Sequence, residues 1–418
     1  MITAVLIGAG QRGARVYGEY ARLHPDRIKI RAVAEPDEER RNWFARMHDL
    51  PENAVFAGWE ELFEQGKLAD CCMVCTQDRS HTEPVKRALA LGYHVMCEKP
   101  MSPDAKECLE MGEYAKKYNR TLTICHVLRY SPFFTKIKEI LDSSMIGEIV
   151  SIQHTECVGF WHQAHSFVRG NWRDAEKASP MILQKCCHDM DILSWLTGKS
   201  CRAVSSFGNL KHFRSENAPE GAGTYCIKDC KAEPTCPYSA DKIYLRDEKG
   251  YSETFRKVVA LSGEKEDVRK ALMDGPYGRC VYHCDNNVVD HQVVNLLFED
   301  GVTASLTMSA FTYEETRMLH VMGTKGEITG DMLKNCIEVR DFLTGNKEEY
   351  DIKTDGTGHS GSDGKFMEGL IRTVETAGEY SVSGAAASVE SHLMALAAEE
   401  SRVTGETIYL DKYRAKFL

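Results

Sequence analysis

No apolar run in the 418 residues approaches the roughly 18 that a membrane-spanning helix needs, so no membrane partner is expected. The chain has fewer basic than acidic residues, with 52 lysines and arginines against 62 aspartates and glutamates, and its net charge is −10. No basic cluster stands out, which argues against a nucleic-acid surface. The sequence opens directly on an apolar segment, so no secretory signal is expected before it.

Sixteen cysteines occur in this chain, and without a secretory signal they favour a reduced compartment. We therefore expect a cytoplasmic protein without a disulfide framework. Cys71, Cys72 and Cys75 lie in an apolar segment and are interpreted as small buried residues. Other thiols could serve as core residues or as metal ligands.

A glycine-rich motif follows the first apolar segment. Ile2 to Ile7 is predicted to form a buried parallel strand, and Gly8, Gly10 and Gly13 then complete a G-x-G-x-x-G pattern that opens a helix. In such a motif one glycine makes the turn, one lets the backbone approach a pyrophosphate, and one lets helix and strand pack closely. The sequence thus predicts a dinucleotide site at a helix N-terminus; the alternative is a glycine-rich turn without a ligand.

An acidic residue follows the glycine motif at the spacing expected of a dinucleotide site. The apolar segment from Ile28 to Ala34 is predicted to be the second strand, and Glu35 follows it, where a ribose 2′-hydroxyl would be bound. A carboxylate there repels a 2′-phosphate, which favours NAD over NADP. Arg40 and Arg41 lie close enough along the chain to keep NADP open.

The expected fold is α/β, with two parts. Strands and helices alternate over residues 1–122, which predicts a parallel Rossmann sheet with helices on both faces. Residues 123–418 fit an α+β domain with a large, mainly antiparallel open sheet, including strands at 288–298 and 302–308 and a helix at 385–403. The segment 208–280 is polar, contains cysteine and proline, and is interpreted as an insertion in that sheet.

Several further motifs together resemble the Gfo/Idh/MocA oxidoreductase family over most of the chain. Besides the glycine motif they are Thr76 with His81, Gly92 to Val95, Glu98-Lys99-Pro100, His126 to Tyr130, Ile146 to Ile149, His188 to Gly198, and Gly323 to Glu327. The resemblance implies a Rossmann domain, a substrate domain with an open sheet, and hydride transfer between NAD(P) and a secondary alcohol of a sugar or cyclitol. It also implies a homo-oligomer.

Lys99 and His188 are the main catalytic candidates. Lys99 follows a predicted strand, where α/β sheets bind ligands, and its ammonium could stabilise charge on the reacting oxygen. The resemblance places this lysine between nicotinamide and substrate and makes His188 the acid/base. A solvated surface lysine and a satisfied core histidine are the structural alternatives.

One position departs from the family pattern. Dehydrogenases of the family often carry an aspartate four residues before the histidine, and here that residue is Gln184, followed by Lys185. Glutamine can orient a hydroxyl but cannot take its proton. Either His188 works without the carboxylate, or Lys185 supplies a second catalytic cation, which is the reading we adopt.

Other residues are predicted to bind the coenzyme or the substrate. The predicted coenzyme ligands are Gly8, Gly10, Gln11, Arg12, Gly13, Glu35, Thr76, His81, Glu98 and Lys99. Donors and an aromatic ring suit a carbohydrate pocket, so the predicted substrate ligands are His126, Arg129, Tyr130, His165, Arg169, Trp172, Gln184 and His359. For the segment from His165 to Trp172, a purely structural loop is the alternative.

Three thiols in the insertion raise the question of a metal. Cys226, Cys230 and Cys236 form C-x3-C-x5-C in a segment expected to have little core of its own, which is consistent with a structural zinc. Cys280, His283 and Cys284 are candidates for a fourth ligand. Unligated thiols are the alternative.

The predicted function is therefore NAD-dependent oxidation or reduction of a secondary alcohol on a sugar, glycoside or cyclitol. A redox-neutral glycosidase, which oxidises a carbon transiently and eliminates the aglycone, would use the same residues. A non-catalytic NAD-bound sensor is a third hypothesis.

Overall fold

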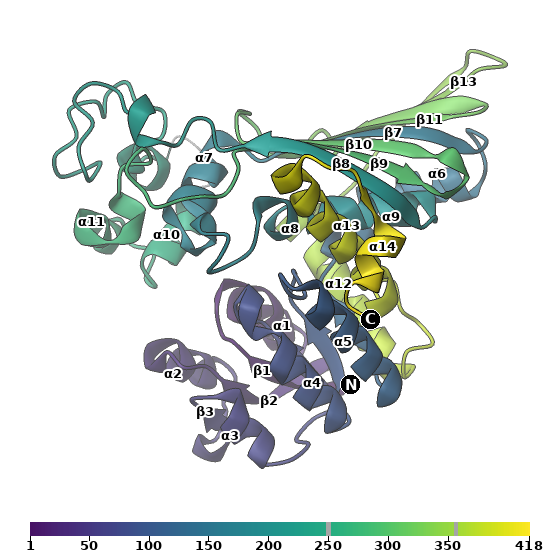
Figure 1. Cartoon of the computed structure of the whole chain (residues 1–418). Coiled ribbons are helices and arrows are strands. Elements are labelled where there is room, and N and C mark those ends of the chain that lie inside the picture. Colours follow the sequence, from purple (N-terminus) through teal and green to yellow (C-terminus); the bar gives the residue numbers. More distant parts are fainter. Residues whose placement is uncertain (248–251, 355–357) are drawn as a thin grey trace.

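The computed structural model describes residues 1–247, 252–354 and 358–418, the side chains of 358–360 excepted. Within this part of the chain the strands form two sheets, one of six strands and one of nine (Figure 1). The first sheet and its helices lie on one side of the molecule, and the second sheet forms an open layer on the other. This is the α/β architecture that the sequence predicts.

The first sheet is wholly parallel, with the order β3-β2-β1-β4-β5-β6. Its strands are β1 (Ile2–Ile7), β2 (Ile28–Ala34), β3 (Val55–Phe56), β4 (Cys71–Val74), β5 (His94–Cys97) and β6 (Leu122–Ile124). β1 and β4 are buried almost throughout, as expected for a parallel sheet covered on both faces. The polar residues after these strands therefore gather along one edge.

Helices between the strands cover the faces of the first sheet. They are α1 (Glu19–Leu23), α2 (Glu38–Met47), α3 (Trp59–Glu64), α4 (Thr82–Ala90) and α5 (Ala105–Lys117). α5 begins where Asp104 caps it, accepting hydrogen bonds from the amides of Lys106 and Glu107. After α4 the chain turns at Gly92, whose φ of +87° suits glycine.

The second sheet has the order β14-β13-β12-β11-β7-β10-β9-β8-β15 and is antiparallel except for the pair β7 and β10. Its strands are β7 (Ile149–Cys157), β8 (Cys201–Asn209), β9 (His291–Phe298), β10 (Thr303–Ser309), β11 (Thr316–Gly323), β12 (Gly326–Asp331), β13 (Cys336–Asp341), β14 (Lys347–Asp351) and β15 (Ile408–Tyr409). The strands predicted at 288–298 and 302–308 are β9 and β10, which pair with each other.

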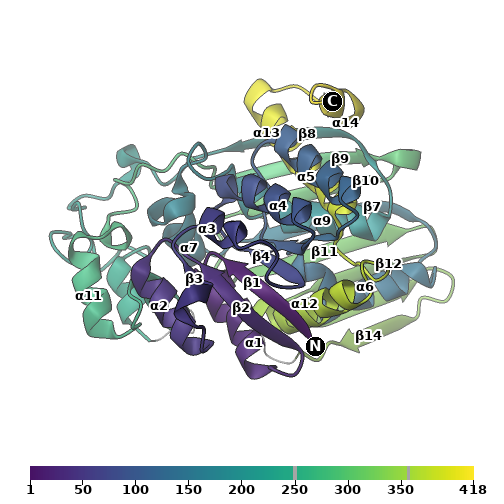
Figure 2. The ribbon, with the colours of Figure 1, turned by 90° about the horizontal axis from the view of Figure 1, so that it is seen from below.

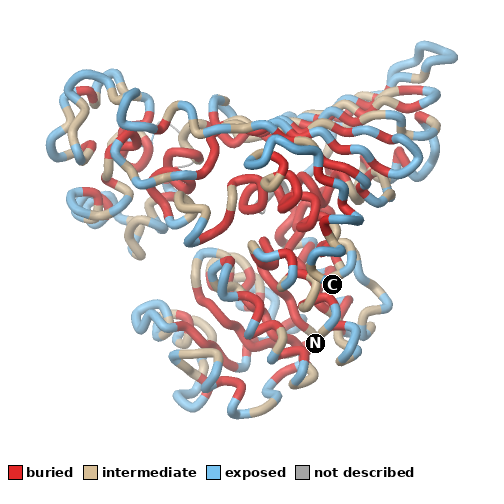
Figure 3. The backbone as a smooth tube through the Cα atoms, viewed as in Figure 1, coloured by how far each residue is buried: buried red, intermediate tan, exposed pale blue. Residues whose placement is uncertain are grey.

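Several helices that follow β6 in the chain lie between the two sheets (Figures 1 and 2). They are α6 (Pro132–Asp142), α8 (Met181–Gln184), α9 (Cys187–Thr197), α12 (Gly358–Glu375), α13 (Ala385–Thr404) and α14 (Leu410–Ala415). Figure 3 shows buried backbone in both sheets and in this intervening layer. α12 belongs to the core of the first sheet, because Phe366 and Leu370 pack in one cluster with Ala4 and Leu6. In the described residues, no helix is long and apolar enough to span a bilayer.

The predicted insertion lies between β8 and β9 and forms a lobe at one end of the second sheet (Figure 1). It contains α10 (Ser252–Val259) and α11 (Lys265–Asp274), beside the short helix α7 (Phe160–His162). The expectation of little core was wrong: Phe213, Tyr244 and Leu272 are among the buried residues of a separate hydrophobic cluster. Aromatic residues spaced irregularly along the sequence supply this core, so helical periodicity did not reveal it.

Candidate active site

The three motif glycines occupy different environments. Gly8 has a φ of +91°, and a Cβ there would lie 2.5 Å from the carbonyl oxygen of Cys75. A Cβ on Gly13 would lie 2.1 Å from the Gly8 oxygen, which reflects close packing of strand and helix. At Gly10, a Cβ would meet no described atom within 4 Å. The loop therefore leaves open space at the position where a pyrophosphate approaches the backbone, which fits a dinucleotide.

Glu35 follows β2 and lies against this loop. Its carboxylate accepts hydrogen bonds from the amide of Ala9 (2.7 Å) and from the amide of Asp37 (3.0 Å). Arg40 also donates to it, at 3.1 Å. Arg41 instead binds the main-chain oxygen of Glu35 at 2.7 Å. Glu35 thus lies beside the glycine loop, and both arginines that could serve NADP contact it; its binding of a ribose stays a prediction.

Arg12, in the glycine loop, contacts the segment after β5 and the helix α12. Its guanidinium binds Glu98 at 2.8 Å and Asp363 of α12 at 2.9 and 3.0 Å. Tyr17 donates to the same Glu98 carboxylate at 2.6 Å. Burial raises the pKa of Glu98, but Arg12 and Tyr17 outweigh it and keep that pKa below its usual range. Gln11 is exposed at the helix start.

Thr76 and His81 connect the loop after β4 to the turn after β5. The ring nitrogens of His81 lie 2.8 Å from the Pro100 oxygen and 3.1 Å from the Thr76 oxygen. Thr76 Oγ1 donates to the Ser80 oxygen at 3.0 Å. Both residues border the predicted coenzyme site, and their polar atoms contact main-chain groups.

Lys99 lies at the centre of the site. Its ammonium donates to the main-chain oxygen of Gln184 (2.8 Å) and to Oε1 of the same residue (3.2 Å). Gln184 Nε2 donates in turn to both carboxylate oxygens of Asp78, at 3.1 and 2.9 Å. Because Asp78 accepts from the amide nitrogen, the amide oxygen is the atom that faces Lys99. A carboxylate thus supports position 184, although it comes from the loop after β4.

His188 is the second residue of α9 and is buried beside another imidazole. The rings of His188 and His126 meet edge to face, with centroids 5.8 Å apart. Neither ring nitrogen of His126 has a hydrogen-bond partner among the described residues. Burial, followed by the charge of Arg129, lowers the pKa of His126 well below its usual value. His126 is therefore uncharged at neutral pH and packs its ring against that of His188.

Lys185 takes part in a buried charge network under the second sheet. Its ammonium lies 2.6 Å from Glu315 and 3.4 Å from Glu156. Arg317 binds Glu156 at 2.9 Å and also Asp189 at 2.8 Å. His162 Nδ1 lies 3.0 Å from Glu315. Two carboxylates contact the Lys185 ammonium, and its predicted catalytic role stays a prediction.

The remaining predicted substrate residues from the first part of the α+β region lie in the interior. Arg129 forms a bidentate contact with Asp191 of α9, at 2.7 and 2.8 Å. Tyr130 is buried and packs edge to face on Phe366 of α12. His359 lies in α12, and its side chain is outside the described part of the chain.

His165 and Arg169 point into the insertion lobe. His165 stacks on Phe255, with centroids 3.8 Å apart, and contacts the Tyr244 hydroxyl at 2.9 Å. Arg169 is fully buried and donates to the main-chain oxygens of Arg279 and Tyr238, both at 2.7 Å. Trp172 packs against the main core and is partly buried. The structure therefore separates His165 and Arg169 from the group around Lys99.

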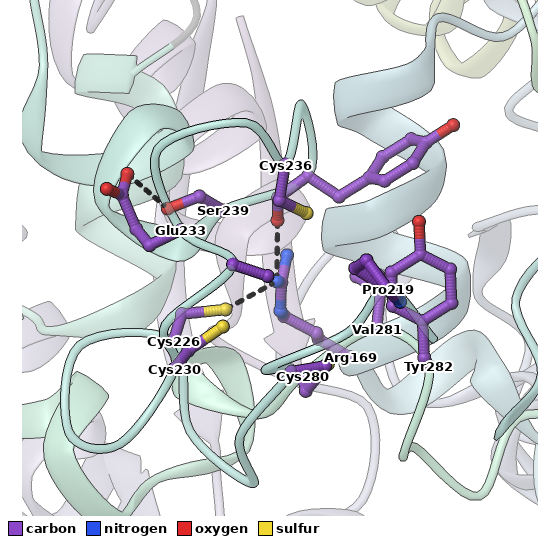
Figure 4. Close-up of a pocket in the computed structure, with 13 residues that line it drawn as sticks. Arg169, Pro219, Cys226, Cys230, Glu233, Cys236, Ser239, Cys280, Val281 and Tyr282 are labelled. Carbon is purple, nitrogen blue, oxygen red and sulfur yellow. Dashed lines mark hydrogen bonds between the residues drawn. The ribbon is translucent and has the colours of Figure 1, made fainter. Parts of the chain in front are cut away.

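The cysteines of the insertion line a small cavity together with Arg169 (Figure 4). Cys226, Cys230 and Cys236 are joined there by Cys280, and Arg169 donates to Cys226 Sγ at 3.4 Å. In the described part of the chain, no three ligating side chains are arranged to hold a metal ion. All these cysteines are free thiols. The zinc prediction is therefore not supported, and its premise fails because the lobe has a core of its own.

Sequence reasoning missed Asp78, His162 and Glu315. Asp78 carries a weak signal, because it stands two residues after Thr76 at the end of a strand. His162 lies three residues before the donor-rich segment that attracted attention. Glu315 lies in an exposed polar turn before β11 and carries no sequence signal.

The fold and this site define an oxidoreductase with an NAD-binding Rossmann unit. Residues 2–126 match the model of an oxidoreductase family with an NAD-binding Rossmann fold, and residues 138–410 match the C-terminal alpha/beta domain of the same family. The chain belongs to the Gfo/Idh/MocA oxidoreductase family, which confirms the resemblance seen in the sequence.

Individual relatives are distant. The chain is 24% identical to the oxidoreductase YteT of Bacillus subtilis over 78% of this chain and 77% of that protein. It is 23% identical to an inositol 2-dehydrogenase of Pseudarthrobacter chlorophenolicus, over 84% and 96% of the two chains. A 2,7-anhydro-N-acetylneuraminate hydratase of Escherichia coli is 28% identical over 51% of this chain and 54% of its own length.

Solved structures share the fold. A levoglucosan dehydrogenase in complex with NADH and levoglucosan superposes with a TM-score of 0.71 at 16% identity, covering 98% of this chain and 99% of the other. An Agrobacterium radiobacter oxidoreductase in complex with NAD+, L-tartaric acid and magnesium gives 0.70 at 15% identity, with the same coverage.

Proposed function

We propose that this chain transfers hydride between NAD and a secondary alcohol of a sugar, glycoside or cyclitol. The observation that carries the proposal is the ammonium of Lys99, which lies just after β5 and is held by Gln184 at 2.8 Å. A cation at that edge of a parallel sheet can stabilise charge on the reacting oxygen. The names of the inositol and levoglucosan dehydrogenases support this substrate class.

Within this proposal, the residues have distinct tasks. NAD, when bound, supplies the carbon that accepts or returns hydride. Lys99 polarises the substrate oxygen, Asp78 orients Gln184 beside it, and His188 exchanges the hydroxyl proton. We propose NAD rather than NADP because the Glu35 carboxylate lies at the loop. A cytoplasmic location and a homo-oligomer stay predictions.

A redox-neutral elimination is the second candidate. It is favoured by Gln184, which cannot replace the carboxylate often found at that position, and by the hydratase among the relatives. It would use Lys99 and NAD in the same way, with hydride returned to the substrate after a leaving group departs.

Purified protein incubated with NAD and a panel of sugars, cyclitols and aryl glycosides tests the proposal. We expect NADH to form with at least one alcohol, without release of an aglycone. Lys99→Met should keep the wild-type Tm and lose turnover by about 100-fold or more. Aglycone release without net NADH would favour the elimination, and unchanged turnover in Lys99→Met would refute the assignment of Lys99.

A further inference from the structure

A second imidazole is oriented by Glu315, a carboxylate that also contacts Lys185, the residue after Gln184. His162 ends α7, and its Nδ1 lies 3.0 Å from Glu315 Oε1. Its side chain is 19% exposed and that of Glu315 is 31% exposed. Nε2 of His162 has no hydrogen-bond partner among the described residues. A histidine held at one nitrogen by a carboxylate, with the other nitrogen available, has the arrangement of a general base.

Glu315 is itself held by a buried cation. Lys185 Nζ lies 2.6 Å from the same Oε1 atom that contacts His162, and its side chain is only 11% exposed. Behind it, Lys185 contacts Glu156, which is fully buried. Burial raises the pKa of Glu315, but His162 and Lys185 outweigh it and keep that pKa well below its usual range. The carboxylate beside His162 is therefore ionised at neutral pH and can stabilise an imidazolium.

This group is connected to Lys99. Gln184 accepts a hydrogen bond from the Lys99 ammonium, and the next residue, Lys185, donates one to Glu315. Burial lowers the pKa of His162, and the charges of Lys185 and Lys99 lower it further, while Glu315 raises it. His165, whose own pKa is lowered by burial and by His162, is the other titratable group that faces it. The positive charge of Lys99 thus contributes to the lowered pKa of His162.

An ordinary exposed ion pair in the same sheet shows what distinguishes this one. His320 lies 2.7 Å from Glu327, with side chains 33% and 31% exposed. That pair joins neighbouring strands, β11 and β12. For the described residues, no lysine or arginine contact to Glu327 is found, whereas Glu315 contacts both a buried lysine and a histidine.

We infer that His162, oriented by Glu315, is a second proton-transfer residue of the Lys99 site and acts on a substrate carbon next to the oxidised one. The inference rests on the proposed function. Oxidation of an alcohol requires a single proton acceptor, which His188 supplies there, so a second base is available for another bond. Once a carbonyl has formed, the neighbouring C–H bond breaks, its proton goes to His162 Nε2, and its electron pair moves onto the carbonyl oxygen, where Lys99 stabilises the charge. Glu315 and Lys185 are positioning residues.

The test follows two bonds separately. Wild-type protein, His162→Gln, Glu315→Gln, Lys99→Met and the matched control His320→Gln are incubated with NAD and either myo-inositol or levoglucosan in D2O. Absorbance reports NADH, and NMR reports deuterium entering the substrate carbon next to the oxidised position. We expect the wild type and His320→Gln to form NADH and exchange deuterium. His162→Gln should form NADH within about 3-fold of the wild type but lose exchange by about 100-fold or more.

The outcomes separate the two proposals. Glu315→Gln should lower exchange with little change in KM, and Lys99→Met should lose both signals. Exchange in His162→Gln at the wild-type rate overturns the inference, and so does NADH formation without any exchange in the wild type. Loss of both signals in His162→Gln, with wild-type NAD binding and Tm, also overturns it, because His162 would then serve the hydride step. A wild-type protein that neither forms NADH nor exchanges deuterium with these two alcohols overturns this assignment for them, whereas the proposed function fails only if the wider panel gives no NADH either.

Discussion

Replacing Arg317 by methionine tests whether the charge network under the second sheet determines stability. Arg317 is 8% exposed and bridges two carboxylates, Glu156 and Asp189, whose side chains are fully buried. In the variant, Asp189 keeps its contact with His154 at 2.8 Å, and Glu156 keeps Lys185 at 3.4 Å. The central cation of the network is lost, while methionine conserves most of the apolar volume.

Removing one partner of a buried ion pair costs about 3–5 kcal/mol, because the other charge stays buried. The two surviving contacts place the expected loss near the lower end, at about 3 kcal/mol. The entropy of unfolding is roughly 2.1 cal/mol/K per residue, or about 0.9 kcal/mol/K for 418 residues, so the Tm should fall by about 3 °C.

The pH dependence of the Tm loss in Arg317→Met is a second, independent prediction. Burial raises the pKa of Asp189, but Arg317 and His154 outweigh it and lower that pKa to about 2. A carboxyl whose folded pKa lies below its unfolded value stabilises the fold above about pH 4 and loses this contribution as the pH falls. In Arg317→Met the folded pKa rises, so the loss in Tm should be largest near pH 8 and should narrow below about pH 5.

Differential scanning calorimetry of Arg317→Met and of Arg340→Met across this pH range measures both effects. Arg340 pairs with Glu338 on β13 and is 52% exposed, so its replacement should cost no more than about 0.5 kcal/mol. Equal Tm losses in the two variants, or a loss in Arg317→Met that grows as the pH falls, would refute the reasoning.

Two further predictions concern the coenzyme site and the surroundings of Lys99. Gly10→Ala should keep the wild-type Tm within about 1 °C, because its Cβ meets no described atom within 4 Å, yet weaken NAD binding about 10-fold or more in calorimetric titration; equal affinity would place the pyrophosphate elsewhere. Asp78→Asn removes the charge that fixes the Gln184 amide, so kcat should fall about 10- to 100-fold with NAD affinity unchanged, and an unchanged kcat would show that the amide needs no such support.

Much of the fold could be predicted because strong local patterns coincide with the elements. Continuous apolar segments became parallel strands, and the alternation before and after 299–301 became β9 and β10. The place of α12 in the core of the first sheet could not be predicted, since helical periodicity shows an apolar face but not its partner. The two helices of the insertion, α10 and α11, were not predicted, because their apolar residues are few and polar residues surround them.

The predicted site residues fall into two groups, those placed by motifs at the ends of elements and those assigned by residue type alone. Lys99, Gln184 and His188 follow motifs at the ends of elements, where topology fixes their position, and the structure brings Lys99 and Gln184 into contact. His165 and Arg169 were assigned to a substrate pocket by residue type alone, and they instead contact the insertion lobe. A donor-rich sequence is equally suited to binding a sugar and to satisfying buried main-chain carbonyls, so only the surrounding fold distinguishes them.

The carboxylate beside Gln184 illustrates a substitution that sequence comparison by position cannot recognise. Read along the chain, glutamine at 184 removes an acid from the site. In three dimensions Asp78, from a loop 106 residues earlier, hydrogen-bonds to the Gln184 amide through both oxygens. The carboxylate therefore lies one side chain further from Lys99 than an aspartate at position 184 would. The amide oxygen of Gln184 contacts Lys99 instead. Because an amide cannot accept a proton at neutral pH, we assign the proposed proton transfers near Lys99 to the imidazoles of His188 and His162.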